Sequence, residues 1–151
     1  MTAIMIFIIA VLLFLSLGHT RLVLYNTETG EVYRRWIARD GLEFSVEFIH
    51  SVNQSPVCDV FVLANGEIRA KETIYSAFGA GVQSELEPGQ TLTYDADGNM
   101  VVSGFDFTYD PLCYIVGTVS DHVLVIEGES ISLRELCGRN AHIAFALRGL
   151  F

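Results

Sequence analysis

The segment FIHSVNQSPVCDVF, residues 48–61, holds the densest group of side chains that could do chemistry. If residues 52–55 form a four-residue hairpin loop, His50 faces Val57 on the partner strand. Asp59 then lies diagonally from His50 on the same face, and a carboxylate beside an imidazole holds the imidazole charged. The pattern favours either a polar ligand or metal site at the rim of a sheet, or a His–Asp pair that only locks the hairpin.

Several kinds of catalytic or metal site do not fit the sequence. Ser51 cannot act as a nucleophile activated by His50, because adjacent side chains of a strand point to opposite faces. The other histidines, His19, His122 and His142, show no spacing typical of metal ligands, such as H-x-x-x-H. We therefore expect no catalytic residues, no metal and no cofactor.

A second segment, SAFGAGVQ at residues 76–83, has two glycines separated by one residue. Gly79, Ala80 and Gly81 could present backbone N–H groups to an anion. The segment lacks the lysine and the following helix of a phosphate-binding P-loop. A tight turn or close backbone packing is the alternative interpretation.

The three cysteines, Cys58, Cys113 and Cys137, do not form a C-x-x-C motif. An odd number of cysteines is not typical of a disulfide framework. If the domain lies outside the cytoplasm, Cys113 and Cys137 could pair and leave Cys58 buried.

These residues need a scaffold, and the sequence predicts one made of β-strands. Short apolar or alternating runs are separated by turn-forming pairs such as Asn65-Gly66. The fold class that we expect is all-β, an antiparallel β-sandwich or barrel of hairpins, with one helical turn at Leu133–Cys137. The expected strands are Leu22–Tyr25, Glu31–Ala38, Leu42–His50, Pro56–Leu63, Glu67–Ile74, Thr91–Tyr94, Met100–Phe105, Tyr114–Thr118, His122–Ile126 and Ile143–Leu147.

The N-terminus is a separate element. Residues 3–17 are apolar except for Ser16, and residues 1–20 approach the length that a bilayer of roughly 30 Å requires. We predict a signal anchor or a cleaved signal peptide at residues 1–20, followed by one domain at residues 21–151. No basic residue precedes this segment and Arg21 follows it, so the positive-inside rule alone would place the domain in the cytoplasm.

The charge of the chain excludes one class of partner. The formal net charge is −9, from 18 acidic and 9 basic residues. Because an acidic surface repels the phosphate backbone, we expect no binding to nucleic acid.

The two segments together resemble the DUF1850 family, a domain of unknown function. HSVNQSPVCDVF and ETIYSAFGAGVQ resemble its H-S-V-x-x-[TS]-P-V-x-[ED] and F-G-A-G-[LV] blocks. The resemblance implies an accessory protein of a tripartite ATP-independent periplasmic (TRAP) transporter of the TAXI class. Such a protein would be a single-pass membrane protein with its domain on the extracytoplasmic side.

The expected partner is then the TRAP permease or its solute-binding protein, with no enzymatic activity. The alternative is a stand-alone extracytoplasmic domain that binds a small molecule or metal. Under either reading, the resemblance implies that the positions for partner or ligand binding are His50, Ser51, Pro56, Asp59, Gly79, Ala80 and Gly81.

Overall fold

The computed structural model describes residues 20–52, 54–76 and 85–149. The predicted N-terminal segment lies outside the described residues except for Thr20, and so do Gly79, Ala80 and Gly81. In the described part of the chain, no helix is long and apolar enough to cross a membrane.

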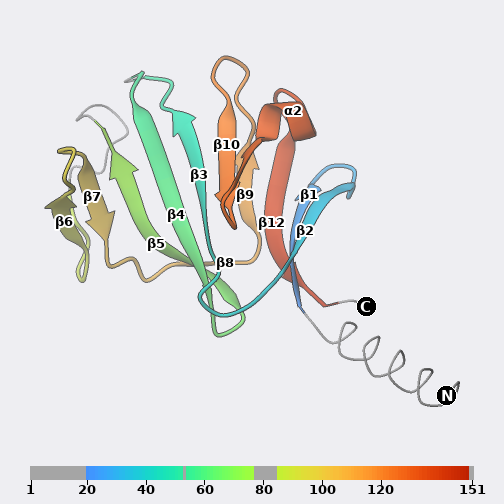
Figure 1. Cartoon of the computed structure of the whole chain (residues 1–151), viewed down its shortest axis with the longest axis horizontal. Coiled ribbons are helices and arrows are strands. Elements are labelled where there is room, and N and C mark those ends of the chain that lie inside the picture. The colour runs from blue at the N-terminus through green and yellow to red at the C-terminus, as the bar shows by residue number, and fades with distance from the viewer. Residues whose placement is uncertain (1–19, 53, 77–84, 150–151) are drawn as a thin grey trace, which may run out of the picture.

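The described chain forms two antiparallel sheets (Figure 1). The smaller sheet has the order β2-β1-β12-β9, with bounds Val32–Ile37, Arg21–Asn26, His142–Arg148 and Leu112–Ile115. The larger sheet has the order β11-β10-β3-β4-β5-β7-β6, with bounds Glu129–Ser132, His122–Ile126, Glu43–Ile49, Pro56–Ala64, Glu67–Tyr75, Met100–Ser103 and Thr91–Tyr94. The short strand β8 (Thr108–Tyr109) pairs with β5, and α2 (Leu133–Cys137) is a short helix.

This architecture confirms the prediction of an all-β antiparallel fold. The predicted helical turn coincides with α2, whose N-cap Ser132 accepts a hydrogen bond from the Glu135 backbone N–H. Two strands were missed, β8 and β11, because each is short and lacks a clear apolar alternation. The β4–β5 turn was predicted correctly: Asn65 and Gly66 both have positive φ, at 55° and 76°.

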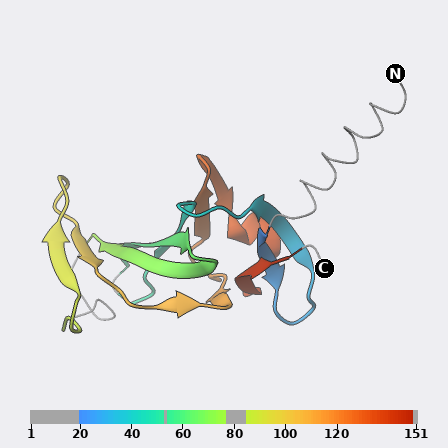
Figure 2. The ribbon, with the colours of Figure 1, turned by 90° about the horizontal axis from the view of Figure 1, so that it is seen from below.

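Both sheets contribute to one hydrophobic core. Leu22, Leu24 and Phe145 from the smaller sheet are fully buried beside Phe44 and Leu124 of the larger one. The rings of Phe44 and Phe145 lie 5.2 Å apart between centroids. The strands β6 and β7 lie at the end of the molecule farthest from β1 and β2 (Figure 2). The core is therefore concentrated where the two sheets face each other.

The β3–β4 hairpin differs from the prediction in its register. Ile49 pairs with Pro56, so the connecting loop has the six residues 50–55 and not four. Asp59 consequently faces Val46, whereas a four-residue loop would place it opposite Phe48. A shift of two residues preserves the face of a strand, so Asp59 still lies on the side of the core.

The three cysteines are free thiols in the structure. Cys113 is exposed on β9 and Cys137 is half-buried on α2, and the bridge that these two cysteines could form outside the cytoplasm is not formed in the structure. Burial raises the pKa of the Cys58 thiol, and it raises the pKa of Cys137 to about 11. Both side chains are therefore protonated thiols at neutral pH.

Candidate functional site

The loop at residues 50–55 is held by hydrogen bonds within itself. The His50 backbone N–H donates to the Ser55 carbonyl oxygen at 2.9 Å, and the Gln54 N–H donates to the His50 carbonyl oxygen at 2.9 Å. The Gln54 side-chain amide donates to the Ser51 carbonyl oxygen at 2.6 Å. His50 Nδ1 accepts from the Val52 N–H at 3.3 Å. The HSV motif therefore builds a structured loop that follows β3 and does not extend it.

This loop borders a cavity of about 410 Å³, which we call the rim pocket. The opposite wall is the loop before β10, and Ser120 Oγ joins the two by donating to the Ile49 carbonyl oxygen at 3.2 Å. Two apolar side chains beside the pocket are exposed, Val52 at 67% and Val119 at 89%. The residues that line the rim pocket are Phe48, Ile49, His50, Ser51, Gln54, Gly117, Thr118, Val119, Ser120 and His122.

Gly117 fixes the shape of the rim pocket. Its N–H donates to Nδ1 of His122 at 3.1 Å, and a Cβ at this position would overlap the Ser120 carbonyl oxygen. Gly117→Ala should lower the free energy of unfolding by about 1–3 kcal/mol, since the backbone on both sides must move. Chemical denaturation measures this. Gly149→Ala is the matched control, because nothing lies within 4 Å of its added Cβ. Equal stabilities of the two variants would contradict the close approach of Gly117 to the Ser120 backbone.

Asp59 lies on the other side of His122, between the two sheets. Its Oδ1 accepts a hydrogen bond from Thr73 Oγ1 at 2.9 Å, and its Oδ2 accepts one from the Tyr114 hydroxyl at 2.9 Å. These partners come from β5 and β9, so the carboxylate joins the larger sheet to the smaller one. The predicted pairing of Asp59 with His50 is replaced by this network.

Burial dominates the electrostatics of this network. It raises the pKa of the Asp59 carboxyl, and the hydrogen bonds from Thr73 and Tyr114 offset only part of that effect. Burial and the neighbouring Asp59 also raise the pKa of the Tyr114 hydroxyl far above its ordinary value. Burial lowers the pKa of His122, although Asp121 and Asp59 act in the opposite direction. Burial therefore favours the uncharged forms of Tyr114 and His122 beside the Asp59 carboxyl.

His122 connects this cluster with the rim pocket. Its ring stacks on Phe48 at 4.9 Å between centroids and meets the Tyr114 ring edge-on at 6.1 Å. Because Nδ1 accepts the Gly117 N–H, this nitrogen carries no proton. His122 is thus a neutral imidazole that lines the rim pocket and contacts Tyr114 of the Asp59 network.

The second cavity, which we call the inter-sheet pocket, has a volume of about 330 Å³ and contains Asp59. Rings from three tyrosines and three phenylalanines surround it. Its lining residues are Asp59, Val60, Phe61, Ala70, Glu72, Thr73, Tyr75, Phe105, Phe107, Tyr109, Leu112, Cys113 and Tyr114. Aromatic side chains beside several polar groups, among them Asp59, Glu72 and Thr73, form a lining that a small-molecule site can use.

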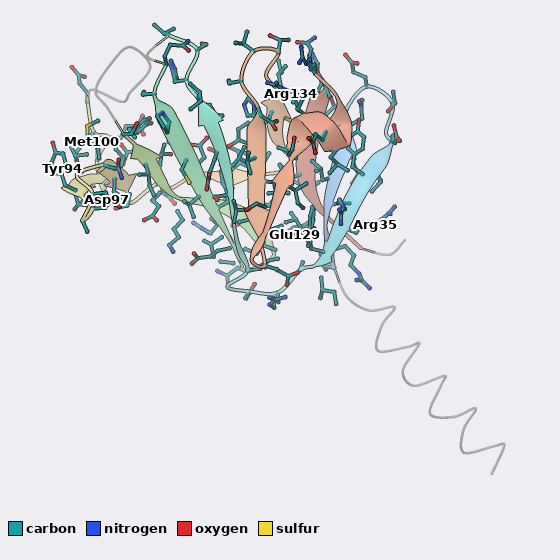
Figure 3. All side chains as sticks on the ribbon, turned by 45° about the horizontal axis from the view of Figure 1, so that its top comes forward. Arg35, Tyr94, Asp97, Met100, Glu129 and Arg134 are labelled. Carbon is teal, nitrogen blue, oxygen red and sulfur yellow. The ribbon has the colours of Figure 1, made fainter. Side chains whose placement is uncertain are left out.

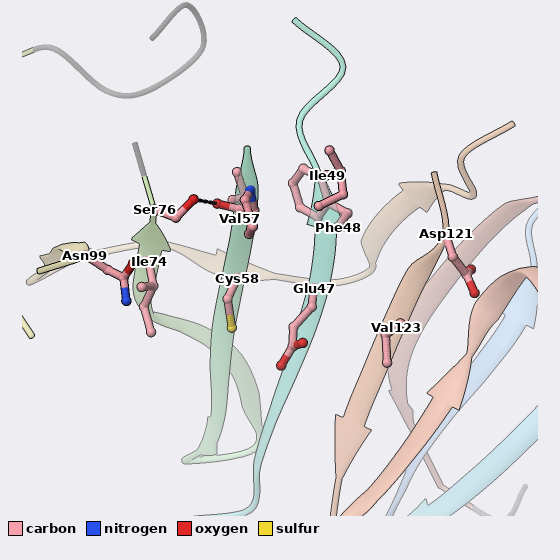
Figure 4. A pocket seen from close by; sticks show the side chains of 11 residues that line it. Glu47, Phe48, Ile49, Val57, Cys58, Ile74, Ser76, Asn99, Asp121 and Val123 are labelled. Atoms are coloured by element: carbon pink, nitrogen blue, oxygen red, sulfur yellow. Dashed lines mark hydrogen bonds between the residues drawn. The ribbon is translucent and has the colours of Figure 1, made fainter. Parts of the chain in front are cut away.

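A third cavity lies on the larger sheet (Figure 4). Pro56 is one of its lining residues. The cavity has a volume of about 390 Å³, and Cys58, Glu47 and Ile74 point into it from three adjacent strands. Ser76 Oγ donates to the Pro56 carbonyl oxygen at 3.3 Å at its edge. The predicted site residues therefore do not converge on one cavity.

The predicted site residues that the structure describes are thus divided among three cavities. His50 and Ser51 line the rim pocket, Asp59 the inter-sheet pocket, and Pro56 the third cavity. Within the described ranges, no group of three or more His, Cys, Asp or Glu side chains could hold a metal ion.

Sequence reasoning missed three residues that complete the network, Thr73, Tyr114 and His122. For Tyr114, the sequence does contain a pattern that indicates its role. Leu112 and Tyr114 alternate onto one face, and a tyrosine on a core face requires a hydrogen-bond partner for its hydroxyl. No comparable pattern indicates Thr73.

Asp59→Asn should flatten the dependence of stability on pH. The folded-state pKa of Asp59 is raised above the ordinary value of 3.8, so the folded protein binds this proton more tightly than the unfolded chain. Its contribution to the free energy of unfolding is full below about pH 4 and is lost as the pH rises through the raised pKa. Asparagine has no proton to lose, so the variant should gain stability relative to the wild type across that window.

Chemical denaturation at several pH values between about 4 and 8 measures this difference. Asp106→Asn is the control, because it makes the same substitution at a fully exposed side chain outside the network around Asp59. If the free energy of unfolding of Asp59→Asn depends on pH as steeply as that of the wild type, a group other than Asp59 causes the dependence.

The comparisons with known proteins match the chain to one family. The family model of the domain of unknown function DUF1850 matches residues 44–133, which is more than half of the chain. The match spans the HSV loop, Asp59, Tyr114 and His122. No curated protein and no solved structure matches the chain. The chain therefore belongs to the DUF1850 family.

Proposed function

We propose that this protein is a membrane-anchored accessory domain of a TRAP-type uptake system of the TAXI class, which acts by binding a partner and not by catalysis. The observation that carries the proposal is the rim pocket. The polar side chains of His50 and Ser51 and the exposed Val119 line it, and the exposed Val52 directly follows Ser51 in the chain. Exposed apolar side chains beside polar groups are typical of a protein–protein contact.

The position of the rim pocket supports one of the two expected partners. Arg21, where β1 begins, pairs with Ile37 and Arg148 at one end of the smaller sheet. The loop at residues 50–55 lies at the opposite end (Figure 1). If residues 1–20 anchor the domain on the extracytoplasmic side, the rim pocket faces away from the bilayer. The soluble solute-binding protein then fits better than the permease.

Affinity purification of the tagged full-length protein from its native membranes in mild detergent tests this proposal. We expect the solute-binding protein to co-elute. Val52→Ser and Val119→Ser should each reduce its recovery roughly 10-fold if these side chains anchor the contact. Ile37→Ser is the matched control, since this exposed residue lies at the opposite end of the domain. Elution of the protein alone, from cells that express the transporter, would contradict the proposal.

The second candidate is a stand-alone extracytoplasmic domain that binds a small molecule. The inter-sheet pocket favours it, because a half-buried carboxyl and six aromatic rings line one cavity. A ligand that binds only the folded protein would raise the melting temperature of the domain. No stabilisation by a broad panel of small molecules would count against this candidate.

A further inference from the structure

We propose that the inter-sheet pocket binds an organic ammonium ion, a small ligand with an alkylated nitrogen cation. The inference rests on the second proposed function and identifies its ligand class. It depends on three properties of the pocket: an acid without a cationic partner, a wall of aromatic rings, and a small volume.

The first property is the charge of Asp59. Its hydrogen-bond donors, Thr73 and Tyr114, are both neutral. The lining contains no Lys, Arg or His, and no ion pair of Asp59 occurs within the described residues. The nearby His122 is neutral, because its Nδ1 accepts the Gly117 N–H. Asp59 is half-buried, and a carboxylate that is partly removed from water is stabilised by a paired cation, so a bound cation would complete this site.

The second property is the aromatic wall. Phe61 of the lining meets two tyrosines edge-on, Tyr109 at 5.8 Å and Tyr114 at 6.5 Å between centroids. Phe105 and Phe107 form a stacked pair at 5.7 Å in the same lining. Aromatic rings attract cations by their quadrupole, and quaternary ammonium groups are bound in such surroundings.

These two properties disfavour other classes of ligand. An anion would be repelled by Asp59 and would find no basic side chain in the lining. A metal ion such as Ca²⁺ requires six or more oxygen ligands, and the described residues offer no acid cluster at this place. A purely apolar ligand would leave the carboxylate uncompensated. The volume, about 330 Å³, suits a small molecule.

Isothermal titration calorimetry on the full-length protein in detergent tests the proposal with choline and its neutral carbon isostere, 3,3-dimethylbutan-1-ol. These probes have nearly the same shape and differ in the positive charge. We expect choline to bind at least about 10-fold more tightly than the isostere. Tetramethylammonium, which is the headgroup alone, should compete with choline.

Two variants locate the binding. Asp59→Asn should abolish the preference for choline, whereas Asp106→Asn should retain it, because Asp106 is fully exposed and outside the lining. Phe107→Ala should weaken choline binding between about 2-fold and 30-fold. Phe107 is 42% exposed, so this variant tests the pocket even if Asp59→Asn does not fold.

Equal affinity for the two probes, or no binding of either, would overturn the proposal. So would an equal loss in Asp59→Asn and Asp106→Asn, which would indicate attraction to the acidic surface in general. Displacement of choline by Ca²⁺ at equal ionic strength would identify a metal site instead. None of these results affects the capture of a partner at the rim pocket, so the two proposals fail separately.

Discussion

A fragment cut at the limits of the family match, residues 44–133, should not fold. It lacks β1, β2 and β12, and β9 would lose the strand with which it pairs. The larger sheet would also lose six large core side chains, which are Leu22, Leu24, Trp36, Leu42, Ile143 and Phe145. At about 1.5–3 kcal/mol for each, this loss equals the whole stability of a typical domain, about 5–15 kcal/mol.

Circular dichroism and two-dimensional NMR of the purified fragment check this result. A fragment of residues 20–149 contains both sheets and should give dispersed amide signals and one cooperative thermal transition. Dispersed signals from residues 44–133 alone would mean that the larger sheet is stable by itself. The folding unit is therefore expected to be larger than the region by which the family is detected.

Tyr114→Ala should destabilise the domain by about 3–5 kcal/mol. The ring packs edge-on against Phe61 and His122, and the hydroxyl bridges to Asp59 on the opposite sheet. Tyr114→Phe keeps the ring and removes one of the two donors to the Asp59 carboxylate. The smaller expected loss, about 1–3 kcal/mol, is the cost of that unsatisfied acceptor.

Denaturant unfolding of the two variants separates the contribution of the ring from that of the hydroxyl. Tyr94→Ala is the control, since this tyrosine is 61% exposed on β6 at the far end of the molecule (Figure 3). Its effect should stay within about 0.5 kcal/mol. Equal losses for Tyr114→Ala and Tyr114→Phe would show that the ring adds nothing to the contact between the sheets.

The strands could be predicted because their signals are local. In β3, Phe44 and Val46 alternate with Glu43 and Ser45, and this period of two defines both the strand and its buried face. The turn at Asn65-Gly66 is equally local, since both residues tolerate positive φ. Patterns of this kind depend on neighbours within a few residues and need no knowledge of the rest of the fold.

The network around Asp59 could not be predicted, because it depends on residues far apart in the sequence. Thr73 is 14 positions from Asp59, and Tyr114 is 55 positions away on the other sheet. Nothing in the order of residues indicates that β9 would lie over β4. The predicted register of β3 and β4 was wrong for a related reason. The six-residue loop is stabilised by a hydrogen bond from the Gln54 side chain, and a rule based on loop length does not include such a bond.

The position of β1 has a mechanical consequence. This strand follows the N-terminal segment directly, and it lies inside the smaller sheet with β2 on one side and β12 on the other. Tension applied at Thr20 along β1 therefore loads both ladders in shear, and their hydrogen bonds lie across the direction of pull. Many bonds must break together before the strand moves, which single-molecule pulling would record as one high-force event and not as gradual peeling. If a tether does precede this strand, the fold is built to resist force on it.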